Sequence, residues 1–104
     1  MVCTADYLDT IHCELKAGRA CVLALRIDDA FLAAHSDTVR IDHSAAADRG
    51  YHATLAVALD DQTHNVLVRN SWGKDWGSDG HAWLSPDYVT HRAEALILFK
   101  GAFQ

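Results

Sequence analysis

Apolar and polar positions along this chain fall into short blocks that predict one helix followed by several strands. Near the N-terminus, four large apolar side chains recur at helical spacing and form one face: Tyr7, Leu8, Ile11 and Leu15. Thr4 or Asp6 can cap this helix at its start, and Gly18 is a typical C-terminal stop. A continuous apolar run over 20–27 then predicts a buried strand.

Two further apolar segments, 54–59 and 65–69, flank a polar turn at 60–63 and predict an antiparallel hairpin. Without a bulge, folding about this turn pairs residues whose numbers sum to about 122. His52 then lies opposite Asn70. An asparagine oxygen can accept the imidazole N–H and hold the ring in one tautomer, which leaves the other ring nitrogen to act on a nucleophile.

Strand alternation divides the residues that follow His52 between two faces. Thr54, Ala56 and Ala58 share the face of His52, and their small size is expected to leave room for a substrate chain or a partner. The large residues, such as Leu55 and Val57, occupy the opposite face.

The rest of the chain predicts shorter elements. In order, these are a turn of helix carrying Phe31 and Leu32 after Asp28 and Asp29, a long loop with one short strand over 35–49, a strand over 81–84, a turn or helix start at 85–87, and a last strand over 94–100. Together they indicate an α+β domain spanning 1–104, with five or six strands and one main N-terminal helix.

Composition limits the possible functions. The chain has 104 residues, 50% of them apolar, which suits one domain with a modest core. Its net charge of -5 argues against nucleic-acid and anionic-membrane binding. No apolar run approaches the ~20 residues that span a bilayer. No signal peptide is visible, which favours the cytoplasm, or export by a route that this chain does not encode.

Cysteines and histidines could carry chemistry, but their spacing is not diagnostic. Cys3, Cys13 and Cys21 are odd in number and show no CxxC spacing, so we expect no disulfide framework. Cys3 falls in the N-terminal segment, Cys13 inside the first helix and Cys21 at the start of a strand. The seven histidines show neither HxxxH nor HExxH spacing. We expect no metal site and no cofactor.

One motif is more specific. The residues His52-Ala53, Asn70-Ser71-Trp72-Gly73, Trp76-Gly77 and Gly80 form a pattern that resembles the C-terminal half of papain-like (C1 family) cysteine peptidases. The resemblance implies an antiparallel, β-barrel-like sheet, the right-hand domain of that fold. It also implies catalytic roles for His52 and Asn70, the second and third members of a Cys-His-Asn site.

Four binding residues follow from the same resemblance. Trp72 is expected to shield the His52–Asn70 hydrogen bond from water, and Trp76 to line the leaving-group side of the cleft. Tyr51 and Ala53 flank the histidine and complete the expected binding set. Trp83 is expected to be an ordinary core residue.

The family's nucleophile lies on a helix in a Cys-Gly-Ser/Ala-Cys-Trp/Tyr context, and nothing in this chain matches that segment. Cys3, just ahead of the helix, is the cysteine nearest to such a position. Two functions therefore stay open. The chain could supply the His/Asn part of a peptidase acting on peptides or proteins, completed by a Cys-bearing partner chain. Alternatively, it is a non-catalytic binding or regulatory module that uses the exposed cleft face for a partner or for self-association.

Overall fold

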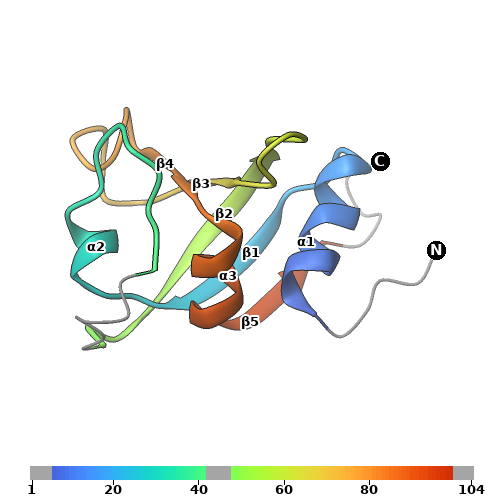
Figure 1. The fold of residues 1–104 in the computed structure, drawn as a ribbon, viewed down its shortest axis with the longest axis horizontal. Coiled ribbons are helices and arrows are strands. Elements are labelled where there is room, and N and C mark those ends of the chain that lie inside the picture. Colours follow the sequence, from blue (N-terminus) through green and yellow to red (C-terminus); the bar gives the residue numbers. More distant parts are fainter. Residues whose placement is uncertain (1–5, 42–47, 100–104) are drawn as a thin grey trace.

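The computed structural model describes residues 6–41 and 48–99 of the chain. The chain runs in the order α1 (Tyr7–Lys16), β1 (Cys21–Arg26), α2 (Asp29–Leu32), β2 (Tyr51–Leu59), β3 (Val66–Arg69), β4 (His81–Leu84), α3 (Pro86–Arg92) and β5 (Ala93–Leu98) (Figure 1). The order of elements follows the sequence pattern, and α3 is longer than the predicted turn or helix start.

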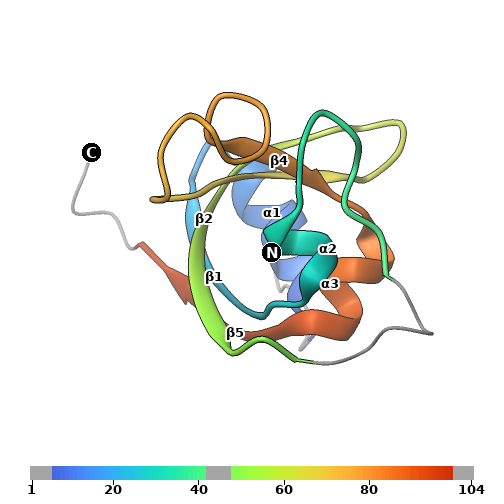
Figure 2. The same ribbon diagram turned by 90° about the vertical axis from the view of Figure 1, so that its left-hand side faces the viewer.

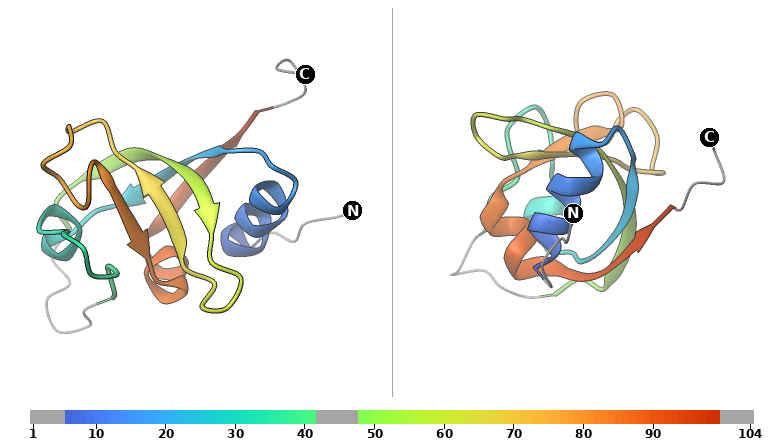
Figure 3. Two further views of the ribbon diagram at one scale, coloured as in Figure 1. Left: turned by 90° about the horizontal axis from the view of Figure 1, so that it is seen from above. Right: turned by 90° about the vertical axis from the view of Figure 1, so that its right-hand side faces the viewer.

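The five strands form one antiparallel sheet in the order β4-β3-β2-β1-β5. The sheet curves around the three helices, which all lie on its concave side (Figures 2 and 3). It is open rather than closed, so the predicted barrel-like sheet is a half-barrel. The fold class is the predicted α+β.

Local sequence signals set both ends of α1. The Asp6 side chain accepts a hydrogen bond from the Leu8 N–H at 2.9 Å, which satisfies one of the free donors of the first turn. Gly18 follows the helix at a φ of 81°, a conformation that glycine adopts without strain. Between these ends, Ile11 is fully buried and anchors the helix on the sheet.

The β2–β3 hairpin forms as predicted, but its register is shifted. Leu55 pairs with Arg69, whereas the expected register pairs it with Leu67. In this part of the hairpin the shift is two residues, which leaves the side chains on their original faces, because side chains alternate with a period of two. His52 and Asn70 therefore stay on one face and become diagonal neighbours instead of directly opposite ones.

The turn itself explains the shift. The Asp60 N–H donates to the Asn65 carbonyl at 2.9 Å, so the loop closes at Asn65 and is longer than the predicted turn. The Asp60 carboxylate accepts from the Gln62 N–H at 2.8 Å and from the Thr63 N–H at 3.2 Å. Next to the loop the pairing is shifted by three residues, with Leu59 opposite Val66, and a register irregularity between Ala56 and Ala58 reduces the shift to two. Neither feature is visible in the apolar pattern.

The core lies between the sheet and the helices, and it corrects one expectation. Thr54 and Ala56, expected beside open space, are 4% and 0% exposed. The Thr54 hydroxyl donates to the Leu23 carbonyl at 3.0 Å, so this face of β2 packs inward. The long loop after α2 approaches the sheet at Val39, which bridges to Leu84. Residues 42–47 and Lys100 lie outside the described residues.

No helix of the described residues covers the convex face of the sheet (Figure 3). Ile97, Val22 and Leu55 are aligned across β5, β1 and β2. Ile97 is 59% exposed, and Val22 and Leu55 are half-buried. Within the described residues, no helix is long and apolar enough to cross a bilayer.

A histidine pair between α1 and the β2–β3 loop should make stability depend on pH. The His12 ring lies against the His64 ring, with centroids 5.2 Å apart, and its Nε2 is buried without a hydrogen-bond partner among the described residues. Burial, and then the neighbouring His64, lower the pKa of His12 below its ordinary value of 6.5. The unfolded chain thus binds this proton more tightly than the folded chain does. The contribution of neutral His12 to the free energy of unfolding is therefore complete above about pH 6.5 and is lost as the pH falls below that value.

We expect the free energy of unfolding, measured with urea at about pH 7.5 and about pH 5.5, to drop at the lower pH. The drop should be smaller in His12→Gln, because that variant lacks the titrating ring. An equal drop in both proteins would contradict the assignment to His12.

Candidate active site

His52 and Asn70 meet at the rim of the half-barrel, where β2 begins and β3 ends. Their side chains come together, with His52 Nε2 2.6 Å from Asn70 Oδ1. The Ser71 backbone N–H, which can only donate, also points at this oxygen from 2.8 Å. The amide is therefore oriented with its oxygen toward the ring. His52 must then donate through Nε2–H.

This orientation determines the tautomer of the imidazole. With the proton on Nε2, the neutral ring carries its lone pair on Nδ1. Within the described residues, no hydrogen bond engages Nδ1. A basic nitrogen is thus available on the side of the ring away from Asn70. Such a nitrogen can take a proton from a thiol or a hydroxyl group.

An aromatic cluster covers the pair. Trp72 stacks on His52 at a centroid separation of 4.3 Å with a 30° tilt, and it is 42% exposed. Phe31, from α2, contacts both rings edge-on, at 6.2 Å from His52 and 5.7 Å from Trp72. Asn70 is only 6% exposed beneath them. Exclusion of water strengthens the hydrogen bond that the two side chains share.

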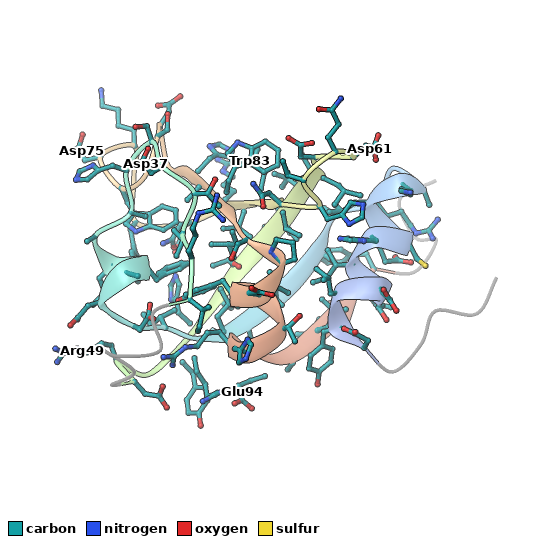
Figure 4. The ribbon with its side chains drawn as sticks, in the orientation of Figure 1. Asp37, Arg49, Asp61, Asp75, Trp83 and Glu94 are labelled. Atoms are coloured by element: carbon teal, nitrogen blue, oxygen red, sulfur yellow. The ribbon has the colours of Figure 1, made fainter. Side chains whose placement is uncertain are left out.

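The four residues predicted to bind substrate separate into different environments. Trp76 is 7% exposed, and its indole N–H donates to the Phe31 carbonyl at 2.9 Å. It supports Phe31 from the core instead of lining a cleft, which corrects the expectation. Tyr51 is 75% exposed and Ala53 is also exposed, on the face of β2 opposite His52. Trp83, expected in the core, is half-buried on the outer face (Figure 4).

The described cysteines do not supply a nucleophile to His52. Cys21 is fully buried, and burial together with the nearby Glu14 raises the pKa of its thiol to about 11. His52 pairs with Leu25 on β1, so Cys21 lies four residues, roughly 13 Å, further along that strand. Cys13 is disulfide-bonded, contrary to the expected thiol. Cys3 lies outside the described residues.

A groove on the outer face was not anticipated from the sequence. It is lined by residues of β1, β2, β3 and β4 and of the loop that follows Asn70, among them Val22, Leu55, Arg69, Lys74 and His81. Arg69 and His81 are cross-strand partners, and within the described residues Arg69 forms no salt bridge. The only sequence signal for this groove was that Arg69 and His81 alternate along their strands with residues that are buried in the core. Within the same residues, no group of three or more His, Cys, Asp or Glu side chains could hold a metal ion.

Comparison with known proteins identifies the family. The family model for the papain family cysteine proteases matches residues 5–95, nearly the whole chain. This chain belongs to the papain family. The recognition made from the His52 and Asn70 motifs is therefore confirmed at the level of the family.

Individual relatives agree with this assignment. The "Uncharacterized peptidase C1-like protein L477" of Acanthamoeba polyphaga mimivirus is 26% identical over 87 residues, which are 81% of this chain and 28% of that protein. Xylellain, a cysteine protease from Xylella fastidiosa, is 29% identical and superimposes with a TM-score of 0.70 over 90% of this chain and 37% of its own.

More distant structures share the fold. Procathepsin L2 from the Tenebrio molitor larval midgut gives a TM-score of 0.65 at 19% identity, over 89% of this chain and 31% of its own. Bromelain from Ananas comosus, solved with the E64 inhibitor, gives 0.63 at 17% identity, over 86% and 44%. This member of the papain family thus spans less than half the length of each of these proteins.

Glycines in the motif allow a sharp test of the site's architecture. Gly77 has a φ of 61°, and a Cβ there would lie 2.2 Å from the His81 carbonyl oxygen. Gly73 has a φ of 93° but open space around it. Gly77→Ala should therefore lower the free energy of unfolding by at least about 2 kcal/mol, because a steric clash adds to the backbone strain.

Gly73→Ala is the matched control and should cost only about 1 kcal/mol, from backbone strain alone. Urea unfolding of both variants measures the difference. Equal losses of unfolding free energy would show that the loop relaxes around the new Cβ at Gly77. Its close packing against β4 would then not constrain the site.

Proposed function

We propose that this chain supplies the His/Asn part of a Cys-His-Asn site for peptide-bond hydrolysis and requires a Cys-bearing partner half. The observation that carries the proposal is the tautomer of His52. The Asn70 oxygen, oriented by the Ser71 N–H, holds the proton on Nε2 and leaves Nδ1 as a base. That is the arrangement a cysteine peptidase needs on its histidine.

In this proposal His52 Nδ1 takes the proton of the partner's thiol, and the resulting thiolate attacks the scissile carbonyl. The C–N bond breaks as the tetrahedral intermediate collapses, and the His52 imidazolium donates the same proton to the leaving amine. Asn70 acts throughout by orienting the ring and stabilising its charged form. A water molecule, deprotonated by the same nitrogen, then releases the acyl group and regenerates the thiol.

The outer face of the sheet supports the partner requirement. Ile97 is 59% exposed beside Val22 and Leu55, and contiguous apolar surface of this kind is typical of interaction sites. Arg69 lies next to this row and has no salt-bridge partner among the described residues. The match covers 37% of xylellain and 44% of bromelain.

Complementation tests the proposal directly. The part of xylellain that this chain does not match would be produced separately, mixed with this chain, and assayed with a fluorogenic peptide. We expect cleavage only in the mixture, because the thiol and its base are then brought together. His52→Ala should reduce kcat/KM by about 10²-fold to 10⁴-fold, because the proton acceptor is lost.

The matched control is His91→Ala, which removes an exposed histidine from α3 and should leave cleavage unchanged. Persistent cleavage in the His52→Ala mixture would refute the role assigned to His52. Absence of cleavage in a mixture that forms a stable complex would refute the catalytic proposal and leave the second candidate.

The second candidate is a non-catalytic binding module, and the same apolar row favours it. Two copies that bury the row against each other would form a symmetric dimer. Sedimentation should then show a mass that rises with concentration, and Leu55→Glu should abolish the rise by placing a charge in the contact. A strictly monomeric wild-type protein would count against self-association.

A further inference from the structure

A buried charged network lies on the opposite side of α2 from the aromatic cluster. Asp28, Tyr88 and Arg92 are 1%, 0% and 3% exposed, although their side chains end in a carboxyl, a hydroxyl and a guanidinium group. The Tyr88 hydroxyl donates to Asp28 Oδ1 at 2.8 Å. Arg92 Nη2 lies 3.5 Å from Asp28 Oδ2. Sixty residues of sequence separate the aspartate from the tyrosine.

This network determines where α2 lies. α2 has only four residues, too few to be stable without tertiary contacts. Asp28 Oδ1 caps it by accepting from the Phe31 N–H at 3.1 Å. The same oxygen accepts from Tyr88, so one atom joins the first turn of α2 to α3. Burial and the bond to Asp28 raise the pKa of Tyr88, which keeps the hydroxyl protonated as a donor.

α2 in turn holds the surroundings of the imidazole. Its Phe31 side chain packs edge-on against both His52 and Trp72. Its Phe31 carbonyl accepts the indole N–H of Trp76 at 2.9 Å. A displacement of α2 would therefore move the aromatic side chains that pack against the His52 ring.

The network also fixes the start of β2. Arg92 Nη1 binds the Asp48 carboxylate, four residues before His52. Arg49 forms a salt bridge with Asp29 at 2.8 Å beside α2 (Figure 4). The Ile27 N–H donates to the Gly50 carbonyl at 2.9 Å, and the Arg49 N–H donates to the Ile27 carbonyl at 2.7 Å. The strand that carries His52 is thus held to β1, α2 and α3 just before the histidine.

We propose that Asp28, Tyr88 and Arg92 are positioning residues for the His52–Asn70 pair, acting through α2 and through the start of β2. The interpretation rests on the function proposed for His52, and it deepens that function by naming the residues that hold the ring in its orientation. A buried ion pair is by itself weak evidence for stability, because desolvation offsets much of its attraction. Its hydrogen bonds instead select one arrangement of the two helices and the strand.

The test reads the ring directly and needs no partner chain. In ¹⁵N-labelled protein at a pH where His52 is neutral, the two ring nitrogens should give well-separated shifts, with Nε2 protonated and Nδ1 bare. Tyr88→Phe removes one hydroxyl from a buried ring and should bring the two shifts measurably closer, as the second tautomer becomes populated. Phe31→Leu breaks the last link of the same chain and should have the same effect.

A core variant separates positioning from general loss of stability. Ile11→Val weakens the core on α1, and its Tm can be matched to that of Tyr88→Phe. If Tyr88→Phe and Phe31→Leu both give the His52 shifts of Ile11→Val, the network is only structural and the proposal is overturned.

This readout also separates the two proposals. If the two His52 ring-nitrogen shifts are well separated in the wild type and move closer in Tyr88→Phe, the result supports positioning even where complementation yields no cleavage. Cleavage in the mixture, combined with unchanged shifts in both variants, upholds the proposed function and rejects the positioning role.

Discussion

The hydrogen bond from the Ser71 backbone to the Asn70 side chain is the constraint on which the arrangement of the His52–Asn70 pair depends. A backbone N–H is a fixed donor, so it decides which end of the amide faces His52 and therefore which ring nitrogen holds the proton. The loop after Asn70 keeps that N–H in place. Its glycines return the chain to β4, where the Asn70 N–H donates to the Gly80 carbonyl at 2.9 Å. The backbone conformation of this loop thus determines which ring nitrogen of His52 carries the proton.

Two buried polar centres flank α2, and they share one principle. The Asn70 oxygen accepts two hydrogen bonds, and the Asp28 carboxylate accepts from a backbone N–H and a hydroxyl group and forms an ion pair with a guanidinium group. Burying polar groups is costly unless they are paired, so each centre strongly disfavours arrangements in which its partners separate. Phe31 lies between the two centres, with its backbone in one and its ring against the other. The shortest helix of the fold is therefore the one with the most defined surroundings.

Local signals in the sequence predicted the elements well, because caps and turns act over a few residues. Asp6 and Asp28 were recognisable as helix caps, and the two apolar segments were recognisable as a hairpin. The register was not predictable, since the Asp60 turn and the irregularity in β2 depend on hydrogen bonds that leave no apolar pattern. Which tryptophan is buried depends on the face of the loop or strand, so Trp76 and Trp83 were interchanged. The Asp28–Tyr88 contact joins distant segments and had no local signal.

The environment of Cys21 explains why this cysteine, among the described residues, is not suited to act as a nucleophile. A useful thiol needs a lowered pKa, which comes from an exposed, electropositive position. Cys21 has the opposite environment: it opens a buried strand, and its thiol keeps its proton at neutral pH. Within the described residues, Cys21 therefore does not serve as the thiol partner of His52.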